Sequence, residues 1–255
     1  MSKVRALILR APGTNCDVET AFAFEQAGAV TSLVHIAALI SGQERLADYQ
    51  ILAVPGGFTY GDDLGAGRVL ANEMRLKMAA ALKRFTQDGG LILGICNGFQ
   101  VLVKTGILPG PPVSPQPGFT LTTNDSGRFE CRWVHLTADP KSPCVFTRGI
   151  ERLYLPVAHG EGKVVAAPDV LARVKATVYY TDEQGQRAGY PHNPNGSAEN
   201  IAGICDESGR IFALMPHPER YIRQSQHPRW TKQGADGRGD GFKIFLNAVD
   251  WVRGR

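Results

Sequence analysis

Short apolar, β-rich runs alternate with helix-like stretches through the first hundred residues. The runs are VRALIL, VTSLVHI, YQILAVPGG and LILGIC, and helical patterns stand between them over about 17–27 and 67–87. Such alternation indicates βαβ units, and nearly continuous apolar runs are expected where helices cover both faces of a sheet. The sequence therefore predicts an α/β fold with a mostly parallel central sheet, and ligands at the carboxyl ends of its strands.

The second half of the chain continues the strand pattern. The strand-like runs ECRWVHL, VVAA, RVKATVYY, IAGIC and RIFALM are expected to extend the same sheet. The Pro/Gly-rich segment 108–117 is expected to be a loop rather than a linker. A final amphipathic helix is expected to dock on the body through Phe242, Ile244, Phe245, Val249 and Trp251. The sequence therefore predicts one domain over residues 1–255.

Charge and hydropathy exclude several classes of function. The 255 residues carry a net charge of +4, without a run of Lys or Arg that would bind a phosphate backbone. No stretch reaches the roughly 20 apolar residues that cross a bilayer, and the N-terminal apolar run is too short for a signal peptide. We therefore expect a cytoplasmic protein that binds neither nucleic acid nor a membrane.

Five cysteines are scattered along the chain, and none belongs to a CxxC pair. An odd number without such pairs argues against a disulfide framework and a structural zinc site. Each cysteine must therefore be judged by its own surroundings. The sequence around Cys96 indicates a chemical role. The sequence around the other four gives no chemical reason to assign one; these are Cys16, Cys131, Cys144 and Cys205.

Cys96 lies at the centre of the string GICNG (94–98), between an apolar strand pattern and a helix-like run. Small flanking residues permit the sharp strand-to-helix turn of a nucleophile elbow. A sulfur atom at a helix N-terminus is also favoured as the thiolate, because the helix dipole is positive there. The string therefore predicts that Cys96 is a nucleophile rather than a buried structural cysteine.

A nucleophilic thiolate needs a general base, and the base needs an orienting carboxylate. The string MPHPE (215–219) follows the apolar run 211–214, so that His217 and Glu219 stand at a second strand end. The turn PGGF (55–58) ends a third strand. It offers backbone N–H groups that, with the N–H of Asn97, are placed to stabilise an oxyanion. Together these strings predict an acyl-transfer site.

The strings PGGF, GICNGFQ and MPHPER, in this order, resemble those of the class I (triad) glutamine amidotransferases. Longer strings are similar to the glutaminase subunits of phosphoribosylformylglycinamidine synthase, and the resemblance spans nearly the whole chain. These strings are RAPGTNCD (10–17), PGGFTYGDDLGAGR (55–68), LTTNDSGRFECRW (121–133), VAHGEGK (157–163) and NPNGS (193–197). The resemblance implies a reaction in which glutamine, ATP and formylglycinamide ribonucleotide give the amidine, glutamate, ADP and phosphate.

The resemblance also implies a role for individual residues. It makes Cys96 the nucleophile, His217 the base and Glu219 its orienting acid, with Gly57 and Asn97 as the oxyanion hole. The residues that it places around the substrate glutamine are Gln100, Asn124, Asp125, Ser126 and His159.

The resemblance implies a division of labour between two proteins. It implies that a partner synthetase binds ATP, magnesium and the ribonucleotide. The resemblance leaves open whether a small third subunit takes part. This chain has no GxxxxGK[ST] loop. No further ligands cluster in sequence with Asp62 and Asp63, so we expect neither a metal nor a cofactor of its own.

Other functions remain to be compared with this one. A peptidase-like hydrolase with a cysteine elbow would carry a histidine soon after the nucleophile, yet none lies between Cys96 and His135. The complete Cys, His and Glu set argues against an inactive regulatory subunit, and the longer strings argue against a partner in guanylate or anthranilate formation. The HPRW tail (227–230) is similar to fused single-chain synthases, whereas the start at Met1 indicates a free-standing subunit.

Overall fold

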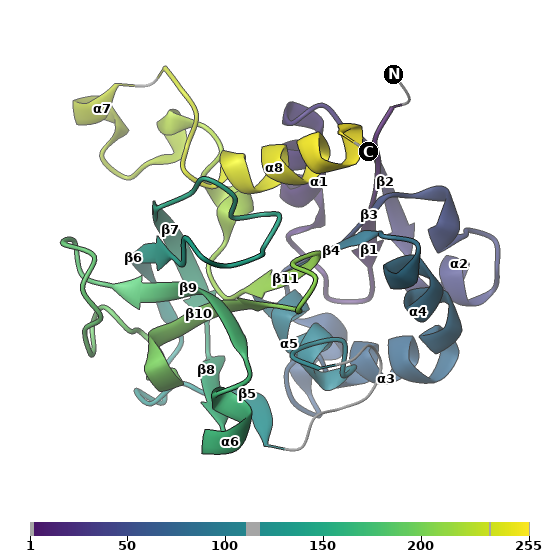
Figure 1. Cartoon of the computed structure of the whole chain (residues 1–255), viewed down its shortest axis with the longest axis horizontal. Coiled ribbons are helices and arrows are strands. Elements are labelled where there is room, and N and C mark those ends of the chain that lie inside the picture. Colours follow the sequence, from purple (N-terminus) through teal and green to yellow (C-terminus); the bar gives the residue numbers. More distant parts are fainter. Residues whose placement is uncertain (1–2, 111–117, 235, 255) are drawn as a thin grey trace.

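The computed structural model describes residues 3–110, 118–234 and 236–254. Its centre is a nine-stranded sheet in the order β2-β1-β3-β4-β11-β10-β9-β6-β7 (Figure 1). Neighbouring strands are parallel from β2 to β11 and antiparallel from β11 to β7. The strands of this sheet are β1 (Arg5–Arg10), β2 (Val30–His35), β3 (Ile51–Val54), β4 (Leu91–Ile95), β6 (Glu130–Ala138), β7 (Arg152–His159), β9 (Lys175–Thr181), β10 (Ile201–Cys205) and β11 (Ile211–Leu214).

Helices cover both faces of the parallel strands, which confirms the predicted α/β architecture. Figure 1 shows α1 and α8 together on one face and α3, α4 and α5 on the other. The helices are α1 (Asp17–Gln26), α2 (Ile36–Ile40), α3 (Arg68–Lys77), α4 (Ala79–Gln87), α5 (Asn97–Lys104), α6 (Pro168–Leu171), α7 (Trp230–Gln233) and α8 (Phe242–Arg253). Short 3-10 helices are η1 (Leu46–Asp48), η2 (Thr59–Asp62), η3 (Ala198–Asn200), η4 (Pro218–Arg220) and η5 (Gln224–Gln226).

Two details of the predicted elements are wrong. The helix expected over 67–87 is two helices, because Met78 leaves the helical conformation with φ −125° and ψ 7°. The run VVAA does not extend the central sheet. It belongs largely to β8 (Glu161–Ala166), which pairs with β5 (Phe119–Thr123) in a separate two-stranded antiparallel sheet. The predicted loop over 108–117 lies largely outside the described residues.

The C-terminal helix docks as its amphipathic pattern predicts. Phe242, Ile244, Phe245 and Val249 are buried, and the Phe245 ring meets the Phe24 ring of α1 edge to face with centroids 5.0 Å apart. Trp251, at the edge of this face, is only partly buried.

The register of the central strands determines where the predicted site lies. Every residue of β3, β4 and β11 is buried. Val54 of β3 pairs with Gly94, and Leu214 of β11 pairs with Ile95. The three strands therefore end at the same level, and the segments after Val54, Ile95 and Leu214 emerge side by side at one edge of the sheet.

Gly98 allows α5 to pack close to β3. A methyl group added to Gly98 would lie 1.9 Å from the backbone oxygen of Val54, which is far inside contact distance. Alanine normally stabilises a helix interior by about 1 kcal/mol relative to glycine, but this contact can only be relieved by moving the helix or the strand.

We expect Gly98→Ala to destabilise the protein by about 3 kcal/mol, which corresponds to a melting temperature lower by about 5–10 °C. Thermal denaturation measures the effect. Gly189→Ala is the matched control, because a methyl group there meets no atom within 4 Å. An unchanged or higher melting temperature for Gly98→Ala would contradict the close packing.

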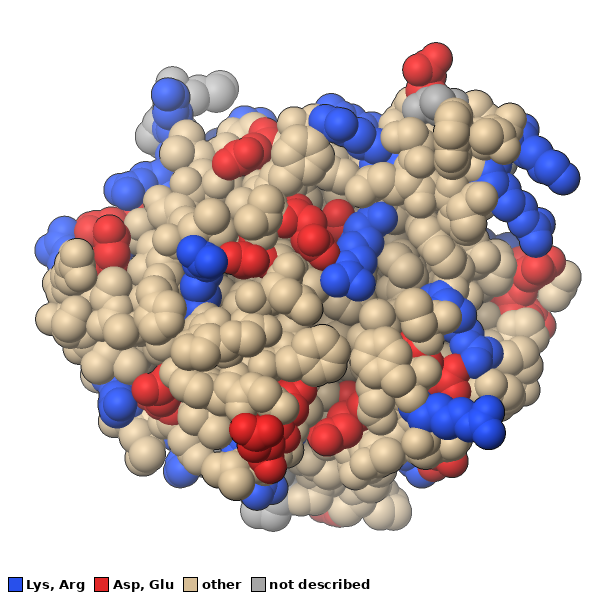
Figure 2. Space-filling model, turned by 180° about the vertical axis from the view of Figure 1, so that it is seen from behind, with Lys and Arg blue, Asp and Glu red and all other residues tan. Residues whose placement is uncertain are grey.

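Charge is dispersed on the face shown in Figure 2, where Lys and Arg side chains alternate with Asp and Glu side chains. Among the described residues, no helix is both long and apolar enough to span a membrane.

Candidate active site

Cys96 is the turning point between β4 and α5. Its backbone has φ 51° and ψ −107°, a conformation that L-residues rarely adopt and that costs of order 1–3 kcal/mol. The Cys96 N–H donates to the Leu214 oxygen of β11 at 2.8 Å, which fixes the turn to the neighbouring strand. Its side chain is buried, with Sγ 3.7 Å from the Ala158 oxygen of β7. The geometry is that of a nucleophile elbow.

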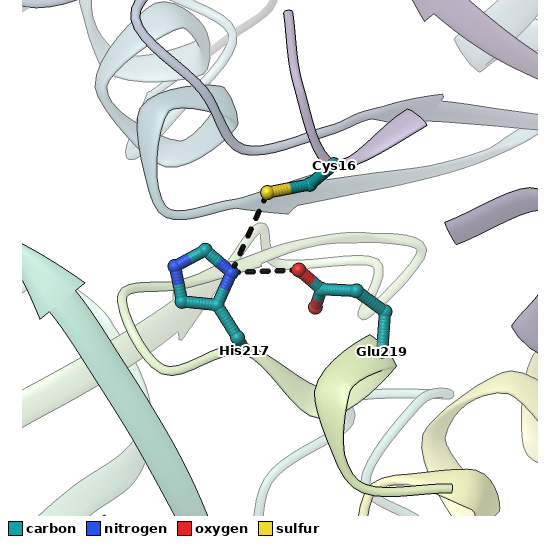
Figure 3. A group of neighbouring side chains, drawn as sticks. All are labelled: Cys16, His217 and Glu219. Atoms are coloured by element: carbon teal, nitrogen blue, oxygen red, sulfur yellow. Dashed lines mark hydrogen bonds and ion pairs between the residues drawn. The ribbon is translucent and has the colours of Figure 1, made fainter. Parts of the chain in front are cut away.

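His217 and Glu219 lie where the chain leaves β11. The His217 N–H donates to the Pro156 oxygen of β7 at 2.8 Å, and Pro218 starts the 3-10 helix η4 that carries Glu219. The two side chains are joined by a 2.6 Å contact between His217 Nδ1 and Glu219 Oε1 (Figure 3). Because Nδ1 is held by the carboxylate, Nε2 is the nitrogen left for proton transfer.

Gly56 lies between the nucleophile and the histidine. A methyl group added to it would lie 2.9 Å from His217 Cε1 and 3.5 Å from Cys96 Cβ. Only a residue without a side chain fits between these two groups. The structure thus brings together the three strings that the sequence analysis assigned to one site.

The environment of His217 favours its charged form. Complete burial by itself lowers the pKa of the imidazole, but the Glu219 carboxylate, together with the Cys96 and Cys16 thiols, raises the pKa well above its ordinary value. An imidazolium beside a cysteine is the arrangement that stabilises a thiolate.

Gly57 and Asn97 present backbone N–H groups near the elbow. Asn97 is the first residue of α5, so its N–H has no partner within the helix. Gly57 has φ 150°. The loop after β1 fixes the segment that contains Gly57, because the Phe58 N–H donates to the Gly13 oxygen at 2.9 Å. Among the described residues, nothing accepts the Gly57 N–H.

The Asn97 and Gln100 side chains form a buried polar chain below the elbow. Asn97 accepts a hydrogen bond from the Thr59 hydroxyl at 2.7 Å and donates to Gln100 Oε1 at 3.0 Å. Gln100 in turn donates to the Glu161 backbone oxygen. These bonds use one amide hydrogen and one Oε1 lone pair of Gln100, and each group has a second. The predicted contact of Gln100 with substrate stays a prediction.

Asn124 and His159 form a buried pair beside the site. His159 Nδ1 lies 3.2 Å from Asn124 Oδ1, which also accepts the Gly162 N–H at 3.1 Å. Burial, with a smaller effect of His217, lowers the pKa of His159 to about 3, so the imidazole is neutral. Its Nε2 is buried and has no hydrogen-bond partner among the described residues. Nε2 is therefore an unused acceptor.

Asp125 and Ser126 lie on the exposed turn between β5 and β6. The Asp125 carboxylate pairs with Lys163, and Ser126 Oγ accepts the Arg128 N–H at 3.3 Å. Their predicted contact with substrate stays a prediction.

Two residues that were not predicted from the sequence also touch the site. Cys16 Sγ lies 4.0 Å from His217 Nδ1, as Figure 3 shows, and the Arg220 guanidinium lies 3.1 Å from the same sulfur. A usable signal was present: Cys16 follows β1, whose carboxyl end lies at the same edge of the sheet as that of β3.

The NPNGS segment was also left without a role. Asn195 donates to the Gly162 oxygen at 2.8 Å, and the Ser197 hydroxyl accepts the Val164 N–H at 3.0 Å. These buried bonds hold β8 and the turn that follows His159.

Three side chains offer metal-binding atoms close together. Among the described residues, Cys16, His217 and Glu219 place one ligand atom each within 4.8 Å of the others. However, His217 Nδ1 and Glu219 are already joined at 2.6 Å, and the Arg220 cation lies against the sulfur. The arrangement therefore fits an orienting network around the histidine better than a metal.

Comparisons with known proteins agree with this geometry. Residues 3–252 match the model of the CobB/CobQ-like glutamine amidotransferase domain family. The phosphoribosylformylglycinamidine synthase subunit PurQ of Dehalococcoides mccartyi is 64% identical over 254 residues, which cover 99% of each chain. The PurQ subunit of Methanococcus maripaludis strain S2 is 43% identical, with 97% of each chain covered.

Solved structures extend the comparison. A chain of the PurLQS structure from Thermotoga maritima superimposes with a TM-score of 0.76 at 34% identity, covering 98% of this chain and 100% of that chain. A second glutamine amidotransferase of Thermotoga maritima shares the fold, with a TM-score of 0.52 at 16% identity and coverage of 100% and 93%. The chain belongs to the glutamine amidotransferase family of PurQ subunits of phosphoribosylformylglycinamidine synthase.

Proposed function

We propose that this chain hydrolyses glutamine and passes the ammonia to a synthetase that converts formylglycinamide ribonucleotide to the amidine. The observation that carries the proposal is the buried His217–Glu219 pair, held against the Cys96 elbow across Gly56. The 64% identical relative is named as a subunit of that synthase, and its length matches this chain. The geometry of the site and the family of the chain therefore support the same proposed function.

The reaction follows from the roles proposed for five residues. The Cys96 thiolate attacks the side-chain amide carbon of glutamine, and the oxyanion that forms is stabilised by the N–H groups of Gly57 and Asn97. His217 donates its proton to the amide nitrogen, ammonia leaves, and a thioester remains. Water adds to the thioester while His217 takes a proton, and glutamate leaves as the sulfur is released. Glu219 holds His217 in the required tautomer.

The substrate contacts are proposed as well. Gln100 lies one helical turn after the nucleophile and is assigned to the amino-acid end of glutamine. The unused acceptor on neutral His159 suits the ammonium group of that end. Asn124, Asp125 and Ser126 complete the proposed pocket on its β5–β6 side.

The remaining chemistry belongs to the partner. We assign ATP and magnesium to the synthetase, and we place the reaction in the cytoplasm. The Thermotoga maritima relative was solved as PurLQS, and the letter S in this name is consistent with a third component. We propose that residues 1–255 act in such a complex as one domain.

Glutamate release from glutamine tests the proposal. It should be measured with this protein alone, and then with the synthetase, ATP, magnesium and formylglycinamide ribonucleotide. We expect slow release alone and strong stimulation by the complete mixture. Release without any effect of the ribonucleotide or the synthetase would retain the amidotransferase and reject the purine reaction. No release at all would reject both.

Two exposed aromatic residues lie beside the proposed site. Phe58 follows the oxyanion turn and is 47% exposed, and Phe129 is 53% exposed. Their rings are stacked with centroids 6.3 Å apart, and Phe129 would lie 3.9 Å from a methyl group on Gly160, next to His159. Ammonia that is passed on without loss to water needs a covered exit, so we propose that the synthetase packs on this pair.

We expect Phe129→Asp to weaken binding of the synthetase at least about tenfold, because a charge replaces a contact that the partner would desolvate. Isothermal titration calorimetry or analytical ultracentrifugation measures the dissociation constant. Leu76→Asp is the matched control, since Leu76 is 71% exposed on α3, at the end away from the elbow. Equal affinity of the Phe129→Asp and wild-type proteins would place the interface elsewhere.

A further inference from the structure

Cys16 is a buried thiol whose sulfur contacts three neighbouring side chains. It is 1% exposed, and its Sγ lies 3.1 Å from Asn15 Oδ1. The Arg220 guanidinium donates to the sulfur at 3.1 Å and is itself held by Glu19 at 2.8 Å. The sulfur also lies 4.0 Å from His217 Nδ1, the nitrogen that Glu219 holds.

The loop that carries Cys16 also holds the oxyanion turn. The N–H groups of Asn15 and Cys16 both donate to the Gly56 oxygen, at 3.4 and 3.2 Å. The Cys16 sulfur would lie 3.1 Å from a methyl group on Gly56. One residue thus contacts the turn through its backbone and the histidine through its side chain.

We propose that Cys16 is a positioning residue for glutamine hydrolysis, which sets the His217 imidazole against the Gly56–Gly57 turn and the Cys96 sulfur. The inference rests on the proposed function, and it deepens that function by adding a residue that acts through His217 and the Gly56 turn. It also explains why the string RAPGTNCD belongs to the site although it carries no residue of the triad.

Cys16 acts as a neutral thiol. Burial is the largest cause that raises the pKa of its thiol above the ordinary value, so it is not a second thiolate nucleophile. The charged and titratable groups around His217 are Glu219, Cys96, Cys16, Arg220 and His159. Contact with Cys16 adds to the interactions that keep His217 protonated. Removal of the sulfur therefore both loosens the imidazole and weakens its hold on the proton.

The test compares Cys16→Ala and Cys16→Ser in the complete complex with the synthetase. We expect Cys16→Ala to lower the glutamine-dependent kcat about tenfold, to change KM less than about twofold, and to move the basic limb of the pH profile to lower pH. Ammonia-dependent turnover should be unchanged. Cys16→Ser keeps a polar atom for Arg220 and should recover most of kcat. Cys131→Ser, at an exposed cysteine, is the control.

Two results would overturn the inference. One is a Cys16→Ala protein with the kcat and pH profile of the wild type. The other is an equal loss of glutamine-dependent and ammonia-dependent turnover, unrescued by Cys16→Ser, which would show a role in general folding. If the wild-type complex itself released no glutamate, the proposed function would fail instead, and the two failures are thus distinguished.

Discussion

Cys96→Ala is expected to abolish amidine formation from glutamine while leaving amidine formation from ammonia intact. The sulfur is the only protein atom proposed to form a covalent bond with the substrate, and its loss removes the covalent pathway. We expect the glutamine-dependent rate to fall by about 10⁴-fold or more, as is typical when a nucleophile is removed. Alanine is smaller than cysteine and therefore fits the elbow without a clash. The synthetase should bind the variant normally and accept ammonia from solution.

The measurement is amidine formation by the complex with either nitrogen donor, at saturating ATP and ribonucleotide. Cys131→Ala is the matched control, because it removes an exposed thiol that the proposed reaction does not use. Loss of the ammonia-dependent rate in a folded Cys96→Ala complex would contradict the division of labour between the two proteins. A Cys96→Ala complex that still used glutamine would exclude this nucleophile.

The sequence predicted the site from motifs that directly follow predicted strands. Three strings follow apolar runs, and the strands of a parallel sheet end at one edge, so the sequence alone predicts that His217 lies near Cys96. What it could not give was the strand order. β11 lies next to β4 although most of the second half of the chain separates them, and only tertiary packing decides that adjacency.

Side-chain contacts were harder to predict than the positions of the backbone segments. The substrate contact of Asn124 stays a prediction, but the sequence did not show that its amide donates to the Arg128 and His159 oxygens and accepts from Gly162. Cys16 was given no role, because a thiol that contacts a histidine through space leaves no spacing pattern in the sequence. Both cases depend on where another loop packs, which local propensity does not encode.

The helix break at Met78 has a similar origin. The run over 67–87 has helical propensity throughout, and no glycine or proline marks its middle. Met78 is nevertheless buried with a non-helical backbone, and the helix on each side of it has its own buried apolar residues. Packing of two apolar faces overrides the local preference here.

Glu219→Gln should separate the charge of the triad acid from its shape. The glutamine side chain still accepts from His217 Nδ1, at present 2.6 Å from Glu219 Oε1, but it brings no negative charge. Burial lowers the pKa of His217, and Glu219 is the strongest of the groups that oppose it. Without the charge the pKa falls, so the imidazolium that accompanies the Cys96 thiolate is lost at lower pH than in the wild type.

The expected result is a basic limb of kcat/KM that moves to lower pH, with a rate near neutral pH reduced roughly 100-fold and less than in Cys96→Ala. Lowering the pH should recover part of the loss, because it restores the imidazolium. A pH series of glutamate release by the complex measures this. A uniform loss at every pH would mean that Glu219 acts by geometry alone, whereas an unchanged profile would remove it from the triad.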